Sequence, residues 1–142
     1  MQVLFVAGFG PIVRDMDESI RFYEKALRLP LEGDDDYRHS ESIDGDKHFA
    51  LWRLEDAAEA CFGEKSWPAD VPVPGAWIEF DVTSMADAVA EMQAAGHRLL
   101  VTDRKEPWGQ IVTRLLSPEG LLVGVTITPW MREPAGAPVA AE

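Results

Sequence analysis

The sequence predicts an α+β domain made of two tandem β-α-β-β-β units, and two observations carry this prediction. Each half of the chain begins with an apolar stretch of strand character, continues into an amphipathic helix and ends in three short strand candidates. The halves also match locally, because residues 13–16 (Val-Arg-Asp-Met) align with residues 82–85 (Val-Thr-Ser-Met) at an offset of 82 − 13 = 69 residues. Neither unit alone could close a hydrophobic core, so pairing the two accounts for the repeat.

Bulk composition limits what the protein can be. Its 142 residues, 46% hydrophobic and 27% charged, suit one globular domain, which we place at residues 1–130. The formal net charge of −12 repels phosphate backbones and argues against a nucleic-acid partner. No apolar run is long enough to cross a bilayer and the chain begins without a signal peptide, so we expect a cytoplasmic protein with no membrane partner. Cys61, the single cysteine, excludes an internal disulfide and is expected to be a buried structural thiol.

The first unit is predicted over residues 3–54. An apolar strand over residues 3–13 is followed by a helix that either Asp15 or Asp17 caps and that extends through Leu27. The apolar face of this helix is formed by Met16, Ile20, Tyr23 and Leu27. The three strand candidates that follow lie around Leu31, over residues 37–43 and over residues 48–54.

The second unit is predicted over residues 76–129, after a proline-rich connector over residues 55–75. A strand at 76–82 leads to a helix through Ala95 that Thr83 or Ser84 caps, and Gly96 suits a left-handed C-cap. Its three strand candidates cover residues 97–102, 111–116 and 121–128. Residues 131–142 lack apolar periodicity and are expected to form a disordered tail.

Three local motifs give this plan a family resemblance. Residues 14–23 (Arg-Asp-Met-Asp-Glu-Ser-Ile-Arg-Phe-Tyr), 107–110 (Pro-Trp-Gly-Gln) and 116–120 (Leu-Ser-Pro-Glu-Gly) resemble segments of the vicinal oxygen chelate superfamily in order and spacing. That superfamily contains glyoxalases, bleomycin-resistance proteins and extradiol dioxygenases. The resemblance covers residues 3–129 and implies a curled mixed sheet with a central cleft and helices outside. It also implies a homodimer, with an interface partly at the connector and the Trp108 region.

Metal-dependent members of the family hold their ion with His, Gln or Glu on the first and last strands of each half. The matching positions in this chain are Gly8, Trp77, Gly124 and a residue near Phe49. None of these side chains is a metal ligand, so no cofactor is expected. A relocated site for a divalent metal is the fallback, with His39, His48 and Glu79 as ligands and Glu41 behind them.

A cleft without metal suggests a binding function. Gly8, Gly10 and Gly124 would widen the cleft, while Trp77, Trp108 and Phe49 would supply aromatic walls. Glu79 shares a strand face with Trp77 and is expected to point into the cleft. Trp52, Trp67 and Trp130 are assigned instead to the core or a dimer interface.

We therefore expect a protein that sequesters a planar or cationic small molecule such as an antibiotic. The alternative is a lyase, isomerase or dioxygenase that uses a relocated metal or Glu79 as a general base.

Overall fold

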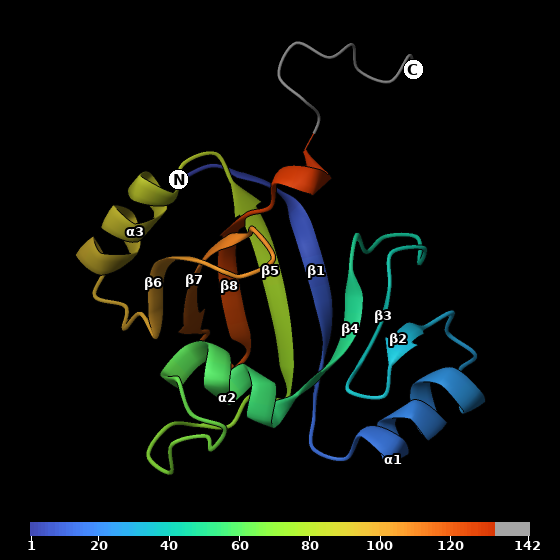
Figure 1. The fold of residues 1–142 in the computed structure, drawn as a ribbon. Helices are drawn as coiled ribbons and strands as arrows, with labels where there is room; N and C mark the ends of the chain where they lie inside the picture. Colours follow the sequence, from blue (N-terminus) through green and yellow to red (C-terminus); the bar gives the residue numbers. More distant parts are fainter. Residues whose placement is uncertain (133–142) are drawn as a thin grey trace, which may run out of the picture.

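The computed structural model describes residues 1–132 and has an α+β architecture (Figure 1). In chain order the elements are β1 (Val3–Val13), α1 (Met16–Ile20) continued by a π-helix (Arg21–Ala26), β2 (Glu32–Asp34), β3 (Tyr37–Ser40), β4 (Phe49–Arg53), α2 (Leu54–Phe62), β5 (Ala76–Val82), α3 (Met85–Ala94), β6 (Val101–Lys105), β7 (Ile111–Leu116), β8 (Leu122–Ile127) and a short 3-10 helix (Pro129–Met131). Within these residues, no helix is long and apolar enough to span a bilayer.

The strands form one curled mixed sheet that joins the two halves edge to edge. Within residues 1–132 the sheet has eight strands in the order β2-β3-β4-β1-β5-β8-β7-β6. In each half the first and last strands are parallel neighbours, β1 with β4 and β5 with β8, and the other pairs are antiparallel. The predicted repeat of two β-α-β-β-β units is therefore confirmed.

The seam between the halves lies at β1 and β5, which pair antiparallel. Its register places Gly8 opposite Glu79, Phe9 opposite Ile78 and Gly10 opposite Trp77. Because Gly8 corresponds to Trp77 and Gly10 to Glu79 at the offset of 69 residues, each pair is the symmetry mate of the other. A pseudo-two-fold axis thus passes between Phe9 and Ile78.

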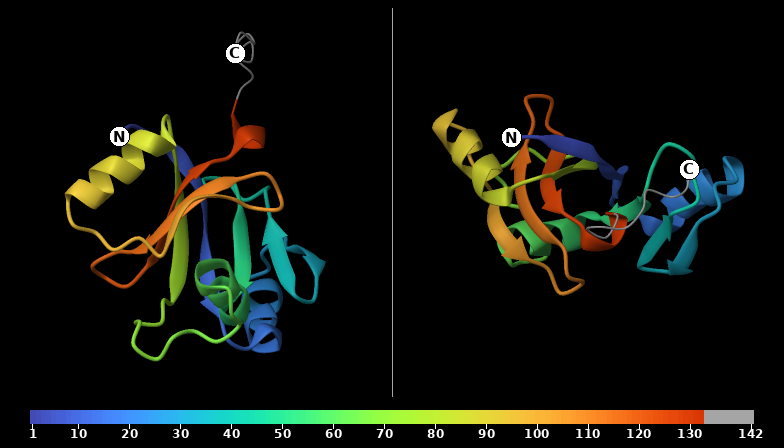
Figure 2. Two further views of the ribbon diagram at one scale, coloured as in Figure 1. Left: turned by 60° about the vertical axis from the view of Figure 1, so that its left-hand side comes forward. Right: turned by 90° about the horizontal axis from the view of Figure 1, so that it is seen from above.

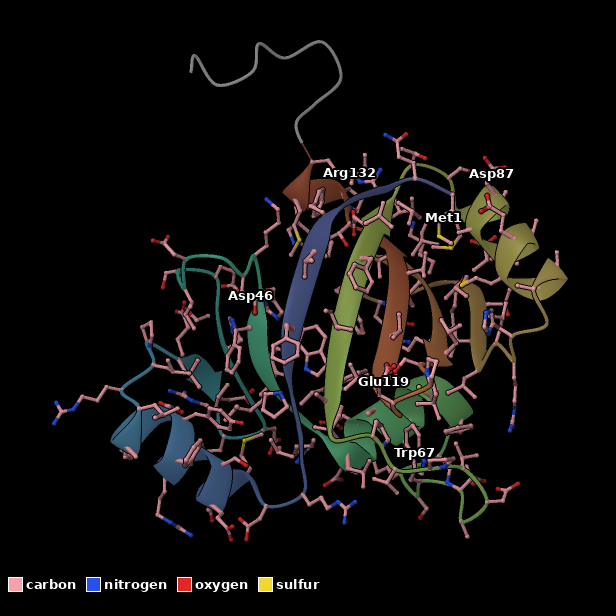
Figure 3. The ribbon with its side chains drawn as sticks, turned by 180° about the vertical axis from the view of Figure 1, so that it is seen from behind. Met1, Asp46, Trp67, Asp87, Glu119 and Arg132 are labelled. Atoms are coloured by element: carbon pink, nitrogen blue, oxygen red, sulfur yellow. The ribbon has the colours of Figure 1, made fainter. Side chains whose placement is uncertain are left out.

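Helices cover the sheet on both faces. Seen from behind, α1 and α3 lie on either side of the central strands β1 and β5 (Figure 3). The core beneath α3 consists of Val82, Ala88, Met92, Leu115 and Val125. On the opposite face lies α2, which crosses in front of the sheet in Figure 1 and can be followed in both views of Figure 2. Its core contains Ile12, Ala50, Ala57, Cys61, Trp77, Val101 and Leu122.

Cys61 is buried, as predicted. Burial raises the pKa of its thiol to about 11. The reactive thiolate is therefore scarce at neutral pH, which suits a structural role.

The two long helices begin at equivalent caps. The carboxylate of Asp15 accepts a hydrogen bond from the Glu18 amide, and the hydroxyl of Ser84 accepts one from the Asp87 amide, both at 3.1 Å. Asp15 and Ser84 are thus the caps among the candidates that the sequence offered. Each satisfies an amide that has no partner within its helix.

The connector differs from its prediction, because α2 lies within residues 55–75. Leu54, Ala57, Ala58 and Cys61 repeat at helical spacing, and Ala57, Ala58 and Cys61 are buried. Gly63 ends the helix with φ of 78°, the left-handed conformation that glycine adopts readily. The helix was not predicted, because the prolines at residues 68, 72 and 74 that follow it suggested an irregular connector.

The ends of two other segments also shift. The strand predicted at 97–102 lies at Val101–Lys105. Its pairing with β7 is irregular between Val101 and Arg104, where Asp103 has φ of 47° and its amide donates to Thr113 Oγ1 at 2.8 Å. Residues 131 and 132, which were predicted to belong to a disordered tail, have a defined structure. Arg132 donates to the buried Asp81 carboxylate at 2.9 Å. Residues 133–142 lie outside the described part of the chain.

Candidate ligand-binding cavity

A cavity of about 1090 Å³ lies between the inner face of the curled sheet and α2. Five large aromatic side chains line it: Tyr37, Trp52, Trp77, Trp108 and Trp130. The charged side chains in its walls are Glu41, Asp56, Glu59, Glu79, Arg104, Lys105, Glu106 and Arg114. The cavity is therefore an aromatic chamber with charges in its floor and around its mouth.

Three of the predicted site residues line this cavity. Trp77 is 4% exposed, and its indole N–H donates to the Ala50 carbonyl at 3.3 Å. Trp108 is 53% exposed, and its indole N–H donates to Gln110 Oε1 at 3.0 Å. Glu79 shares the inner face with Trp77, as the alternation of side chains along β5 predicted.

The three glycines do not leave the empty space that was expected of them. A Cβ on Gly8 would lie 2.8 Å from the Trp77 ring, and one on Gly10 would lie 2.0 Å from the Ala50 carbonyl oxygen. A Cβ on Gly124 would lie 2.9 Å from Glu79 Cγ. These glycines make room for Trp77 and Glu79 and do not widen the cleft.

Phe49 lies apart from the other predicted residues. Its ring packs on Tyr23 with centroids 5.8 Å apart, next to the π-helix. The register of β1 with β4 pairs Phe9 with Phe49, while β5 with β8 pairs Glu79 with Gly124. The first-half equivalent of Gly124 is therefore Ala50, so the sequence alignment was one residue out.

Two tryptophans that were assigned to the core or an interface also line the cavity, and one of them, Trp52, packs against the core as well. Trp52 packs edge-on against Trp77 with centroids 6.2 Å apart, and Trp130 is 59% exposed. Trp67 does have a packing role, because its ring meets Phe62 edge-on at 5.0 Å. Spacing along the sequence could not distinguish these cases, since each depends on where α2 lies.

Glu79 is a partly buried carboxylate with a defined donor. Gln110 Nε2 donates to Glu79 Oε1 at 2.9 Å, and the Gln110 side chain oxygen accepts from Trp108. Burial raises the pKa of Glu79 above its ordinary value, and the Arg114 charge offsets part of that effect. Such a carboxyl can accept or hold a proton at a pH where an exposed glutamate is ionised.

Arg114 was not anticipated from the sequence. On β7 it pairs with Gly124, which in turn pairs with Glu79, so no side chain of β8 separates the two charged residues at this position. Arg114 is 1% exposed, and its Nη2 donates to Glu106 Oε2 at 3.3 Å. Its Nη1 has no hydrogen-bond partner among the described residues. The available signal was an arginine inside an otherwise apolar strand, where a charge needs a partner.

A second cluster of polar side chains lies in the cavity wall. Glu41 Oε2 is 3.0 Å from His39 Nδ1 and also contacts His48 Nδ1. The Tyr37 hydroxyl is 2.6 Å from His48 Nε2. The fallback metal site named Glu79 as the carboxylate beside the two histidines, whereas the structure places Glu41 there. Among residues 1–132, these three residues form the group whose donor atoms lie close enough to hold a metal ion.

The charge of Glu41 suits such a cluster. Burial favours its neutral form, but the hydrogen bond from His39 and the charges of His48 and His39 outweigh this and lower the pKa of Glu41. The carboxylate is therefore ionised between the two imidazoles.

The strand positions at which the family resemblance places a metal do not fit one. They carry Gly8, Ala50, Trp77 and Gly124, and none of these side chains offers a metal ligand. The Trp77 indole and Glu79 fill the space at those positions.

Comparisons with known proteins decide the family. The model of the Glyoxalase/Bleomycin resistance protein/Dioxygenase superfamily matches residues 9–125. The chain belongs to this superfamily. No curated protein matches the chain.

Several solved structures, one of them a superfamily member, share this fold at low sequence identity. A member from Vibrio splendidus 12B01 is 15% identical, with a TM-score of 0.55 over 84% of this chain and 95% of the other. A variant of Streptomyces coelicolor methylmalonyl-CoA epimerase in complex with 2-nitronate-propionyl-CoA is 18% identical, with a TM-score of 0.54 over 94% and 100%. A hypothetical protein from Bacillus halodurans C-125 is 19% identical, with a TM-score of 0.58 over 91% and 97%. At these identities the likeness shows the fold alone.

Proposed function

We propose that this superfamily member binds a planar aromatic small molecule in the cavity between the sheet and α2. The observation that carries the proposal is the set of five large aromatic rings around one cavity of about 1090 Å³. That volume reaches the upper end of the range for small-molecule sites and would enclose most of a drug-sized ligand. Aromatic walls favour a planar ligand, because rings that stack bury a large apolar area at little cost in side-chain entropy.

The exposed tryptophans support an entry for such a ligand at the mouth. Trp108 and Trp130 are 53% and 59% exposed, although both line the cavity. A tryptophan that remains open to water gains by covering its ring with a ligand. Deeper in the cavity Trp77 is held by its hydrogen bond to Ala50. A ligand would therefore stack on one side against the buried ring of Trp77 and on the other against the exposed rings of Trp108 and Trp130.

The floor of the cavity favours a ligand with a hydrogen-bond acceptor. Arg114 lines the cavity and is 1% exposed, and its Nη1 has no hydrogen-bond partner within residues 1–132. A buried charged donor without a partner is costly, so an acceptor on the ligand would relieve that cost. The sequence suggested a planar or cationic ligand, and this arginine favours the planar one. A cationic group would fit beside the exposed carboxylates of the cavity wall, Glu41 and Glu59.

Titration with anilinonaphthalene sulfonate (ANS) tests the proposal, since this probe joins aromatic rings to an oxyanion and fluoresces in apolar surroundings. We expect saturable binding of one ANS per folded chain. Trp108→Ala should weaken it about threefold to tenfold, the value of one aromatic stacking contact. Trp67→Phe is the matched control, because Trp67 packs on Phe62 and should leave binding unchanged. Unsaturable binding, or equal losses in both variants, would refute the aromatic cavity as the site.

The role of Arg114 in ligand binding is tested with a double substitution. Removing Arg114 alone would leave the buried Glu106 with Arg104 as its remaining cationic partner and would destabilise the fold. The double variant Arg114→Gln with Glu106→Gln removes both charges. It should bind ANS at least about tenfold more weakly, because a charge-assisted hydrogen bond is lost. Unchanged affinity would remove Arg114 from the site.

A general-base enzyme is the second candidate, and Glu79 favours it. Its pKa is raised by burial, Gln110 fixes its position, and it lines the cavity. Dicarbonyl, epoxide and catechol compounds are the substrates to screen. Turnover that Glu79→Gln abolishes while ANS binding persists would establish the enzyme. A cytoplasmic location and a role in antibiotic resistance stay predictions.

A further inference from the structure

We propose that His39, Glu41 and His48 bind a divalent transition-metal ion in the wall of the cavity. This site is distinct from the strand positions at which the superfamily resemblance places a metal, and it does not depend on the proposed aromatic ligand. Each of the three residues offers one donor atom, and all these atoms lie within 4.8 Å of one another.

The spacing of the donors needs little adjustment. A tetrahedral zinc ion with bonds of about 2.0 to 2.1 Å holds its ligands about 3.4 Å apart. Glu41 Oε2 already lies 3.0 Å from His39 Nδ1 and contacts His48 Nδ1. Small side-chain rotations would therefore close the triangle around an ion.

The backbone fixes two of the three ligands. His39 lies on β3, opposite Ala50 of β4, and Glu41 follows β3 directly. The Ser40 hydroxyl accepts a hydrogen bond from the Ser42 amide at 3.1 Å and so holds the bend that carries Glu41. Preorganised ligands reduce the entropy that metal binding must overcome.

The third ligand is oriented by a neighbour. Tyr37 contacts His48 Nε2 through its hydroxyl at 2.6 Å, and the rings of His39 and His48 stack with centroids 5.5 Å apart. A group bonded to the second ring nitrogen of a histidine fixes the orientation in which the first nitrogen meets a metal. Glu41 Oε2 contacts both imidazoles, and a cation would bind between these three donor atoms.

The donor set selects the class of metal. Two imidazoles and one carboxylate suit Zn²⁺, Co²⁺ or Ni²⁺, whereas Mg²⁺ and Ca²⁺ prefer oxygen ligands alone. Three protein ligands leave at least one coordination position open. Because Glu41 and His48 line the cavity, that position would face whatever occupies it.

The test is a zinc titration of untagged, chelator-treated protein by calorimetry, repeated with Co²⁺ and visible absorption. We expect one ion per chain. His39→Ala and Glu41→Gln should each weaken zinc binding at least tenfold. His97→Ala is the matched control, because His97 is the remaining histidine of the chain, is exposed beyond α3, and should leave the affinity unchanged.

Folding does not confound this comparison. The side chains of His39 and Glu41 are 26% and 49% exposed, and circular dichroism of each variant checks that it is folded. Wild-type protein that takes up no zinc at 100-fold excess over the chain would overturn the proposal. Equal losses in the His97→Ala and His39→Ala variants would overturn it too, since they would place the ion elsewhere. ANS titration of Glu41→Gln separates this outcome from a failure of the aromatic site.

Discussion

Glu79 lies on the floor of the cavity with one well-defined donor, Gln110, and across Gly124 from Arg114. Burial raises its pKa above the ordinary value of 4.5. The folded protein therefore keeps this proton to a higher pH than the unfolded chain does. Between the unfolded and folded pKa values, stability falls as the pH rises, and above the folded pKa the full cost remains.

Glu79→Gln should remove that cost. Its amide oxygen can still accept from Gln110 but does not ionise, so the variant should be more stable than wild type at pH 8. Each unit of pKa elevation corresponds to about 1.4 kcal/mol. The difference should vanish at pH 4, where the wild-type carboxyl is protonated in both states. Urea unfolding at the two pH values measures it, with Glu119→Gln on an exposed turn as the charge control. A difference that is equal at both pH values would contradict this account.

Two glycines offer a second test, because they differ in what surrounds them. A Cβ on Gly10 would lie 2.0 Å from the Ala50 carbonyl oxygen, whereas one on Gly75 would have no atom of the described chain within 4 Å. Gly10→Ala should destabilise the protein by at least about 2 kcal/mol, since the backbone must move. Gly75→Ala should stay within about 0.5 kcal/mol of wild type. Chemical denaturation of the two variants measures this, and similar values would show that β1 and β4 are not so closely packed.

At the scale of elements, the N-caps link sequence and structure most directly. Ser84→Ala removes the acceptor for the Asp87 amide and should cost about 1 kcal/mol in the free energy of unfolding. Ser84→Asp should keep most of that stability. Thr83→Ala is the control, because the Thr83 side chain is exposed and should have little effect. If Thr83→Ala proved the costlier substitution in urea unfolding, the cap would be Thr83.

Much of the element plan could be read from the sequence. The strands at Val3–Val13, Ala76–Val82 and Ile111–Leu116 lie where alternation and turns predicted them. The helix α2 was missed although its apolar spacing was visible, because the prolines after it suggested a linker. The start of β6 was misplaced, because Leu99 and Leu100 are apolar and pack on the cores, whereas regular pairing with β7 begins at Val101 after one backbone hydrogen bond from Leu100 to Arg114.

The candidate site was predictable only where it depended on neighbours along the chain. Trp77 and Glu79 share a face of β5 because they are two residues apart. Arg114 approaches Glu79 only through the strand order β5-β8-β7, and Trp52 lines the cavity only because α2 folds over it. Strand order and helix placement are long-range properties, and local periodicity does not specify them.

For the whole molecule, the homodimer implied by the resemblance remains a prediction. On the outer face of the sheet Val6 and Phe9 are 39% and 42% exposed, and they pair with Phe80 and Ile78 across the seam. The strands that carry these residues, β1 and β5, lie between α1 and α3, as Figure 3 shows from behind. A second copy of the chain would remove these apolar side chains from water. This surface differs from the connector and the Trp108 region, where the resemblance implied the interface.

Sedimentation equilibrium tests the dimer. We expect a mass of twice 15.8 kDa for wild type, and a shift toward monomer for Phe9→Glu, which places a charge among these apolar side chains. Phe22→Glu is the control, because Phe22 is exposed on the π-helix and lies away from the seam. A wild-type protein that stays monomeric at all concentrations would contradict the prediction.

The contact between position 8 and Trp77 also constrains how this lineage can evolve. A side chain at Gly8 would meet the Trp77 ring at 2.8 Å, so no larger residue fits there while the tryptophan remains. A metal ligand could be introduced at position 8 only together with a smaller residue at position 77. Either substitution alone would leave a clash or a void in the core. The two positions are therefore epistatic, and their packing opposes a metal ligand at position 8.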